Sequence, residues 1–193
     1  MTDVLVPFAD AATAADAVAA TQRWLEGAVI GLNLCPFAKA VHVKRQIRYA
    51  VTAAATADDL LAELRHELAL LDETDPEVIE TTLLIHPRAM TDFIDFHFFL
   101  QEADAALRAL GEQGRLQIAS FHPAYEFAGS APDDVANCTN RSPHPTLHLL
   151  RETSIDRAVA AFPDAAAIYE RNVETLRRLG HEGWRRLWLS DRD

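Results

Sequence analysis

The chain has 193 residues, of which 49% are hydrophobic and 24% charged, and its formal net charge at pH 7 is −11. A chain of this size can bury a substantial core, so we expect one domain over residues 1–193, with short tails at about 1–10 and 185–193. The negative charge argues against nucleic acids and anionic membranes as partners, because both are bound through clustered lysine and arginine.

The first half of the chain alternates between helical and extended patterns. Thr13 to Asp16 has the form of a capping box, and apolar residues then recur at helical spacing. Thr56 is a further N-cap signal, placed before a stripe of leucines. These patterns predict a helix over about 13–30, a half-exposed strand over 41–52, a helix over 57–72 and a buried strand over 80–86.

The second half continues this alternation. Thr91 and Asp92 open a helix that we expect to end at Gly111, since glycine is the usual residue after a helix C-terminus. The next predicted elements are strands over 116–121 and 146–150, a helix over 154–162 and a last helix, capped by Asp164, that ends at Gly180. We expect the tryptophans at 184 and 188 to pack on the body of the protein.

This order of elements predicts an α/β or α+β fold: a single layered domain whose central sheet has about four to five strands with helices packed on it. Helical crossovers of this length would make the first three strands parallel neighbours. A ferredoxin-like arrangement with antiparallel pairs is the alternative, and the periodicity does not decide between them.

No apolar run approaches the ~20 residues of a membrane-spanning helix. The first residues lack the basic and apolar segments of a signal peptide, which predicts a cytoplasmic location. With only two cysteines, Cys35 and Cys138, a disulfide framework is not expected.

The segment from Ser120 to Glu152 is the most unusual part of the chain. It contains some twenty residues with little apolar periodicity that are rich in His, Asp, Asn, Arg, Ser and Pro. Loops longer than about 12–15 residues inside a domain are usually functional or disordered. The prolines and aromatic residues of this segment favour an ordered loop, so the sequence predicts a functional site here.

Two predicted strands end in the same dipeptide, His86-Pro87 and His122-Pro123. Ligands of open α/β sheets bind beyond the carboxyl ends of the strands, so two parallel strands would place both imidazoles at one rim. The alternative is that each histidine only hydrogen-bonds nearby backbone at the end of its strand.

The first functional hypothesis is an enzyme that acts on a small anionic metabolite. His122 would be the general acid or base and Cys35 the nucleophile, with an aspartate orienting the histidine. Arginine binds carboxylate or phosphate with two hydrogen bonds, so Arg141 and Arg151 would hold the anion. The orienting residue would be Asp133 or Asp134, and the further ligand-binding residues would be Asn140, Ser142 and His148.

Two other hypotheses remain open. Cys35, His86, His122 and His148 would form a credible zinc or iron site, although their spacing matches no compact metal motif. The third hypothesis is a non-enzymatic binding or scaffold domain with a structured loop, in which the arginines pair with Asp133, Asp134 or Glu152.

Three segments resemble the signature segments of domain-of-unknown-function family 1415, a family without an activity to carry over. They are Gly31–Ala38, His122–Gly129 and Thr139–Glu152, and the resemblance extends from the first helix to about residue 180. The positions that match are Cys35, His122, Arg141, His148 and Arg151. The family pattern has an aromatic residue at position 144, where this chain has histidine, and no particular cysteine at 138.

Overall fold

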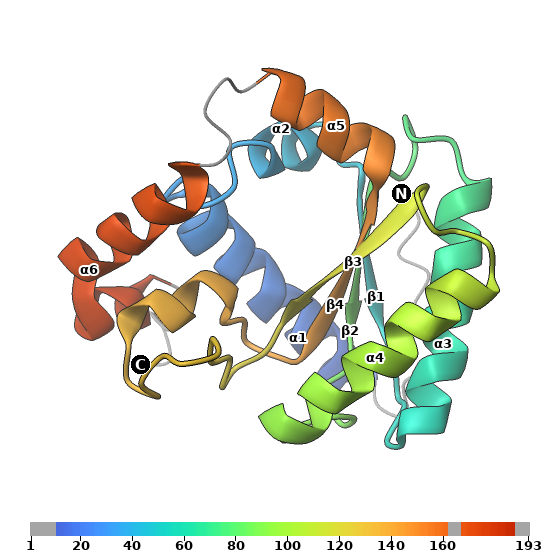
Figure 1. Ribbon diagram of the computed structural model, residues 1–193, viewed down its shortest axis with the longest axis horizontal. Coiled ribbons are helices and arrows are strands. Elements are labelled where there is room, and N and C mark those ends of the chain that lie inside the picture. Colours follow the sequence, from blue (N-terminus) through green and yellow to red (C-terminus); the bar gives the residue numbers. More distant parts are fainter. Residues whose placement is uncertain (1–10, 162–166, 188–193) are drawn as a thin grey trace.

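The computed structural model describes residues 11–161 and 167–187. These residues form a layered α+β domain around a four-stranded sheet with the order β1-β2-β4-β3 (Figure 1). The strands are β1 (Ile47–Val51), β2 (Thr81–Ile85), β3 (Leu116–Phe121) and β4 (Thr146–Arg151).

Helices cover both faces of the sheet. The long helices α3 (Ala57–Glu73) and α4 (Phe93–Ala109) lie on one face. The other face is covered by α1 (Ala11–Trp24), which continues into a π-helical turn η1 (Leu25–Ile30), and by α2 (Ala38–Val43) and α5 (Glu152–Ala161) (Figure 1). Helix α6 (Ile168–Arg186) lies farther out on the same side, next to the segment between β3 and β4. In the described residues, no helix is both long enough and apolar enough to cross a membrane.

The predicted helix ends of the central region are confirmed. The side chain of Thr56 accepts a hydrogen bond from the backbone N–H of Asp59, and Asp92 caps α4 by accepting from the backbone N–H groups of Ile94 and Asp95. Gly111 follows the last residues of α4 with φ = 75°, a left-handed conformation that glycine adopts without steric cost.

The predicted fold class is confirmed, and the structure settles the strand order, which the sequence left open between parallel neighbours and antiparallel pairs. Strand β1 is parallel to β2, whereas β4 is antiparallel to both β2 and β3. The first three strands therefore run in one direction, as expected, but β4 separates β2 from β3. The burial of the two strands agrees with this order, because every residue of β4 is buried or half-buried, while β3 carries the exposed Gln117 that an edge strand tolerates.

Two predicted boundaries need correction. Residues 41–43, expected in a strand, form the end of α2, where the N–H of Lys44 bonds to the carbonyl of Ala40, and β1 begins only at Ile47. The last helix does not end at Gly180. Its backbone breaks there (φ = 67°) and resumes, which carries Trp184 into a buried cluster, as predicted for this residue. Positions 164 and 188 lie outside the described residues.

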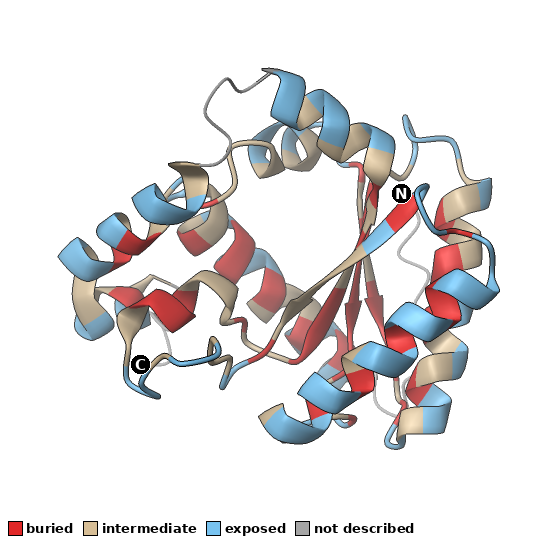
Figure 2. Cartoon of the chain, viewed as in Figure 1, coloured by how far each residue is buried: buried red, intermediate tan, exposed pale blue. Residues whose placement is uncertain are grey.

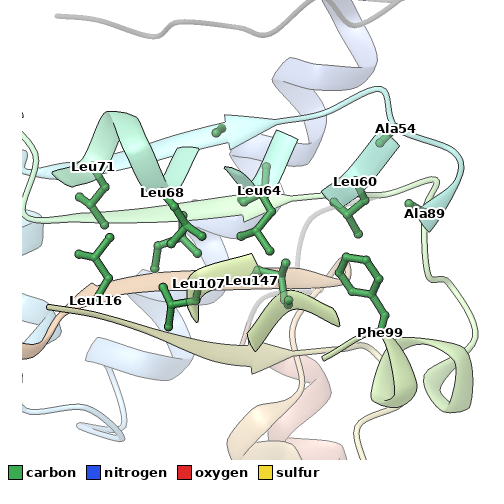
Figure 3. Packing of buried hydrophobic residues seen from close by; sticks show 14 of the residues in the cluster. Ala54, Leu60, Leu64, Leu68, Leu71, Ala89, Phe99, Leu107, Leu116 and Leu147 are labelled. Carbon is green, nitrogen blue, oxygen red and sulfur yellow. The ribbon is translucent and has the colours of Figure 1, made fainter. Parts of the chain in front are cut away.

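The main hydrophobic core lies between the sheet and the pair α3–α4. The leucine stripe of α3 is fully buried and faces Leu116, Leu107 and Leu147 across the layer (Figure 3). A second apolar layer lies on the opposite face, where Ala14 and Ala17 of α1 pack on Val51, Leu83 and Ile85. Buried residues accordingly border both sides of the strands, while the outer sides of α3 and α4 are largely exposed (Figure 2).

A buried ion pair links the sheet to α3. Arg48 of β1 donates two hydrogen bonds to the carboxylate of Glu67, from Nε at 2.7 Å and from a terminal nitrogen at 2.9 Å. Both side chains are almost completely buried. Removal of one partner from such a pair leaves the other charge buried without compensation, which is far more costly than the loss of an exposed pair.

We therefore expect Glu67→Gln to lower the free energy of unfolding by about 3 kcal/mol or more, as measured by urea denaturation. The control is Glu73→Gln, an exposed carboxylate on the same helix, which should change stability by less than about 0.5 kcal/mol. Equal, small effects of the two substitutions would show that Arg48 does not depend on Glu67 for its burial.

Candidate functional site

Side-chain alternation along β4 separates the residues that the sequence placed in one site. Leu147, Leu149 and Arg151 point toward α3 and α4, because Leu147 and Leu149 belong to the core on that face. His148 and Leu150 therefore point to the opposite face. The predicted orientation of His148 away from its two leucine neighbours is confirmed by this arrangement.

A cavity of about 300 Å³ lies on the His148 face of the sheet. Its wall is formed by side chains from β1, β2, β3 and β4 and from α1, η1, α2 and α5. The apolar residues of the wall include Trp24, Leu25, Val29, Phe37, Val41, Ile47, Leu83, Phe121, Leu150, Ile155, Ala158 and Val159. Val159 belongs to the wall and is also 49% exposed, so the cavity opens beside α5.

Few polar groups reach this cavity. They are Cys35, Glu80, Thr81, His148 and Ser154, together with Arg151 at the end of β4. Cys35 and His148 are thus two predicted site residues that the structure does bring to one place. No hydrogen bond joins them among the described residues, so the contact that would activate the thiol is not formed.

His148 is held by Thr81 on the neighbouring strand. Nε2 of His148 lies 2.8 Å from the hydroxyl oxygen of Thr81, and this hydroxyl donates to the carbonyl of Leu149 at 2.6 Å. The ring also lies beside Phe121, with 6.1 Å between the ring centroids. Burial lowers the pKa of His148 to about 4, which keeps the imidazole neutral at physiological pH.

The two strand-end histidines lie together, but they do not face a ligand site. His86 and His122 are 0% and 1% exposed, and both rings contact Phe96. Nδ1 of His86 donates to the carbonyl of Ala89 at 3.0 Å, leaving Nε2 buried without a partner. Burial lowers the pKa of His86 to about 4.

His122 has a protein partner at each ring nitrogen. Nε2 donates to the carbonyl of Met90 at 3.2 Å, and Nδ1 accepts from the N–H of Ala124 at 3.1 Å. These bonds fix a neutral ring, in agreement with a pKa that burial lowers. Backbone groups therefore orient His122, in place of the predicted aspartates Asp133 and Asp134.

The segment between β3 and β4 is an ordered loop, and hydrogen bonds from its own polar side chains hold it in place. Arg141 donates to the carbonyls of Tyr125 and Pro132, so it ties the loop to backbone oxygens and not to the expected carboxylates. The buried Asn137 accepts from the N–H of Phe127 and from the hydroxyl of Ser130. This network agrees with the structured loop of the third hypothesis.

The other predicted residues of the loop take part in the same local network. The amide of Asn140 donates to the carbonyl of Ser120, and the hydroxyl of Ser142 donates to the carbonyl of His144. Asp134 caps the short 3-10 helix η2 (Val135–Asn140) by accepting from the N–H of Ala136, and the backbone carbonyl of Asp133 accepts from His181. Their roles in binding a ligand stay predictions.

Arg151 has a structural partner as well. One terminal nitrogen donates to the carbonyls of Leu71 and Thr74, at the C-terminus of α3, and to that of Ile79. A cation there compensates the negative end of the helix dipole. The guanidinium group is therefore used on the α3 side of the sheet.

The predicted metal set is divided between two places. Cys35 and His148 line the cavity, whereas His86 and His122 pack against Phe96 at the strand ends. Over residues 11–161 and 167–187, no three His, Cys, Asp or Glu side chains form a group that could hold a metal ion. The remaining cysteine, Cys138, is buried, and burial raises the pKa of its thiol.

A second, shallower hollow of about 480 Å³ lies between the loop and α6. It is lined by Phe127 to Ser130, by Asp134 and Ala136, and by Tyr169, Glu170, Val173, Glu174 and Arg177 of α6. Three carboxylates face a single arginine in this hollow, so it offers an anion little net attraction. The apolar cavity beside α5 is the better candidate site, as most small-molecule sites are concave and apolar with a few polar groups.

Sequence reasoning missed most of the cavity wall. Thr81 and Phe121 were predicted in two different strands and Trp24 in a helix, and nothing in their spacing shows that they converge. One signal was available: His148 interrupts an apolar strand with a polar group, and a buried polar group needs a partner, which is Thr81.

The fold and the cavity define a layered α+β domain with an apolar cavity on one face of its sheet. The profile of the family described as "Protein of unknown function (DUF1415)" matches residues 16–186, so the chain belongs to this family. No curated protein and no solved structure matches the chain. The family resemblance noted in the sequence is therefore confirmed, and the function has to be argued from the site.

The lowered pKa of His148 makes a prediction about acid stability. The unfolded imidazole takes up a proton with a pKa of about 6.5, whereas the folded ring stays neutral down to about pH 4. The unfolded state therefore binds more protons in this range, and stability falls as the pH falls from about 6.5 to 4. When the pH falls from 7 to 5, the free energy of unfolding of the wild type should decrease by about 2 kcal/mol more than that of His148→Phe.

Urea denaturation at several pH values checks this prediction. The control is His66→Phe, which replaces an exposed histidine on α3 and should leave the pH dependence of the wild type in place. Parallel stability curves for His148→Phe and the wild type would contradict the burial of a neutral imidazole.

Proposed function

We propose that the protein binds a small, predominantly apolar molecule in the cavity between the sheet and the helices α1, η1, α2 and α5. The observation that carries this proposal is the size of the cavity combined with its apolar wall. An apolar cavity of roughly 150 Å³ in another protein takes up benzene, and the present cavity has about 300 Å³.

The local structure of the wall supports the proposal. Leu25 and Val29 come from the π-helical turn η1, in which the N–H of Gly31 bonds to the carbonyl of Glu26 and that of Leu34 to Val29. Such turns are rare inside helices and frequent at functional sites. Here the wider turn brings two apolar side chains into the wall next to Trp24.

The contacts of the arginines favour an apolar ligand over the anionic metabolite expected from the sequence. Arg141 and Arg151 already donate to backbone carbonyls, and His122 has partners at both ring nitrogens. An anion in the loop would have to displace these bonds. An apolar molecule in the cavity would not have to displace any of these hydrogen bonds, because the cavity is already open in the protein without a ligand.

Benzene is a suitable probe, since it tests the apolar cavity without any polar contact. A ligand that binds only the folded protein raises the free energy of unfolding, by about 1–3 kcal/mol at a ten- to hundredfold excess over Kd. We expect benzene to raise the Tm of the wild type. Ala158→Phe, which places a ring in the cavity wall, should abolish this shift.

The matched control is Ala160→Phe, which adds the same ring at an exposed position of the same helix. This variant should respond to benzene as the wild type does. An equal benzene response of Ala158→Phe and Ala160→Phe, or no response of the wild type, would overturn the proposed function.

A further inference from the structure

We infer that His148 is a hydrogen-bond acceptor at the polar end of the cavity, and that it selects neutral ligands carrying a donor, such as an alcohol or a phenol, over ethers and carboxylates. This inference rests on the proposed function and adds the chemical class of the ligand. It depends on which ring nitrogen of His148 carries the proton.

The contacts of Thr81 decide the position of that proton. Thr81 has one hydroxyl hydrogen, but its oxygen lies 2.8 Å from Nε2 of His148 and 2.6 Å from the carbonyl oxygen of Leu149. A carbonyl can only accept, so the hydroxyl hydrogen goes to Leu149. Nε2 of His148 must then bring its own hydrogen and donate to Thr81, because two lone pairs would otherwise face each other.

The second ring nitrogen is left as an acceptor. With the proton on Nε2, the neutral ring has a lone pair on Nδ1. Within the described residues Nδ1 has no hydrogen-bond partner, and it is not one of the polar atoms that are sealed in the protein interior without a partner. Since the ring forms part of the cavity wall, the accessible surface of this atom borders the cavity.

The wall of the cavity, as the described residues form it, offers an anionic ligand no free cation, because the hydrogen bonds of Arg151 are directed elsewhere. Glu80 and Arg151 are the charged residues of the described wall. The guanidinium group of Arg151 donates to carbonyls at the C-terminus of α3, and its Nε is buried. A carboxylate in the cavity would meet the lone pair of His148 in a largely apolar wall, while the guanidinium of Arg151 is directed toward the carbonyls of α3, and burial of an unpaired charge is costly.

Three probes of nearly equal size separate the effects of the donor and of the charge: 1-octanol, its isomer methyl heptyl ether, and octanoate. Calorimetric titration of the full chain at pH 7 should give a Kd for 1-octanol that is about two- to tenfold lower than the Kd for the ether. This ratio corresponds to the net free energy of one hydrogen bond. Octanoate should bind at least about tenfold more weakly than the alcohol.

Two variants test whether His148 causes the preference. His148→Phe keeps a ring in the wall but removes the acceptor, so the ratio of the two Kd values should fall to about one while the ether still binds. Thr81→Val removes the partner of Nε2 and frees the proton to occupy either nitrogen, so it should reduce the same ratio. Nitrogen-15 NMR of the wild-type histidines should show His148 protonated at Nε2 and unprotonated at Nδ1.

The outcomes distinguish this inference from the proposed function. Equal affinity of the wild type for alcohol and ether, a preference that survives in His148→Phe, or tightest binding of octanoate would overturn the role of His148 and leave the apolar cavity in place. A failure of benzene and of all three probes to bind would overturn the proposed function, and this inference with it.

Discussion

Side chains alternate along a β-strand, and in this protein the alternation along β4 determines which groups can meet. The strand lies between β2 and β3 in the sheet and is covered by helices on both faces. Arg151 must therefore point toward α3, where it binds the carbonyls at the helix C-terminus, and His148 must point toward the cavity. A site that used both side chains would need a strand without this alternation.

The two faces of the sheet differ in how completely they are packed. On the α3–α4 face, leucine side chains fill the layer (Figure 3). The buried pair Arg48–Glu67 adds a polar contact between β1 and α3 on this face. On the opposite face, the small residues Ala14 and Ala17 of α1 pack on Val51, Leu83 and Ile85 of the strands. The space that remains farther along this face, between η1, α2 and α5, is the cavity.

Local signals in the sequence were sufficient for the fold class and for most elements. The N-caps Thr56 and Asp92 and the leucine stripe of α3 depend on neighbouring residues only, so they could be predicted. The position of β4 could not, because strand order depends on pairing between segments distant in sequence. The first residues of the strand predicted over 41–52 were wrong for a similar reason, since a few alternating apolar residues also suit one turn of helix, here α2.

In the candidate site, too, local features could be predicted from the sequence and contacts between distant segments could not. His148 was predicted to face away from its leucine neighbours, and it does. The density of polar residues in the loop after β3 indicated a ligand site, yet Asn137, Arg141 and His122 use their polar groups to hold the loop itself. Composition cannot distinguish these two uses of a polar side chain, because the difference lies in which acceptor each donor finds in three dimensions.

We therefore propose that ligands bind in the cavity on the His148 face of the sheet and that the polar loop has a structural role. Mapping of backbone amide chemical shifts during titration with 1-octanol tests this claim directly. We predict that the largest shifts fall on η1, on β4 around His148 and on α5 around Ala158, all of which border the cavity. Shifts concentrated in the loop over residues 123–144, or an absence of shifts at the cavity, would contradict the account.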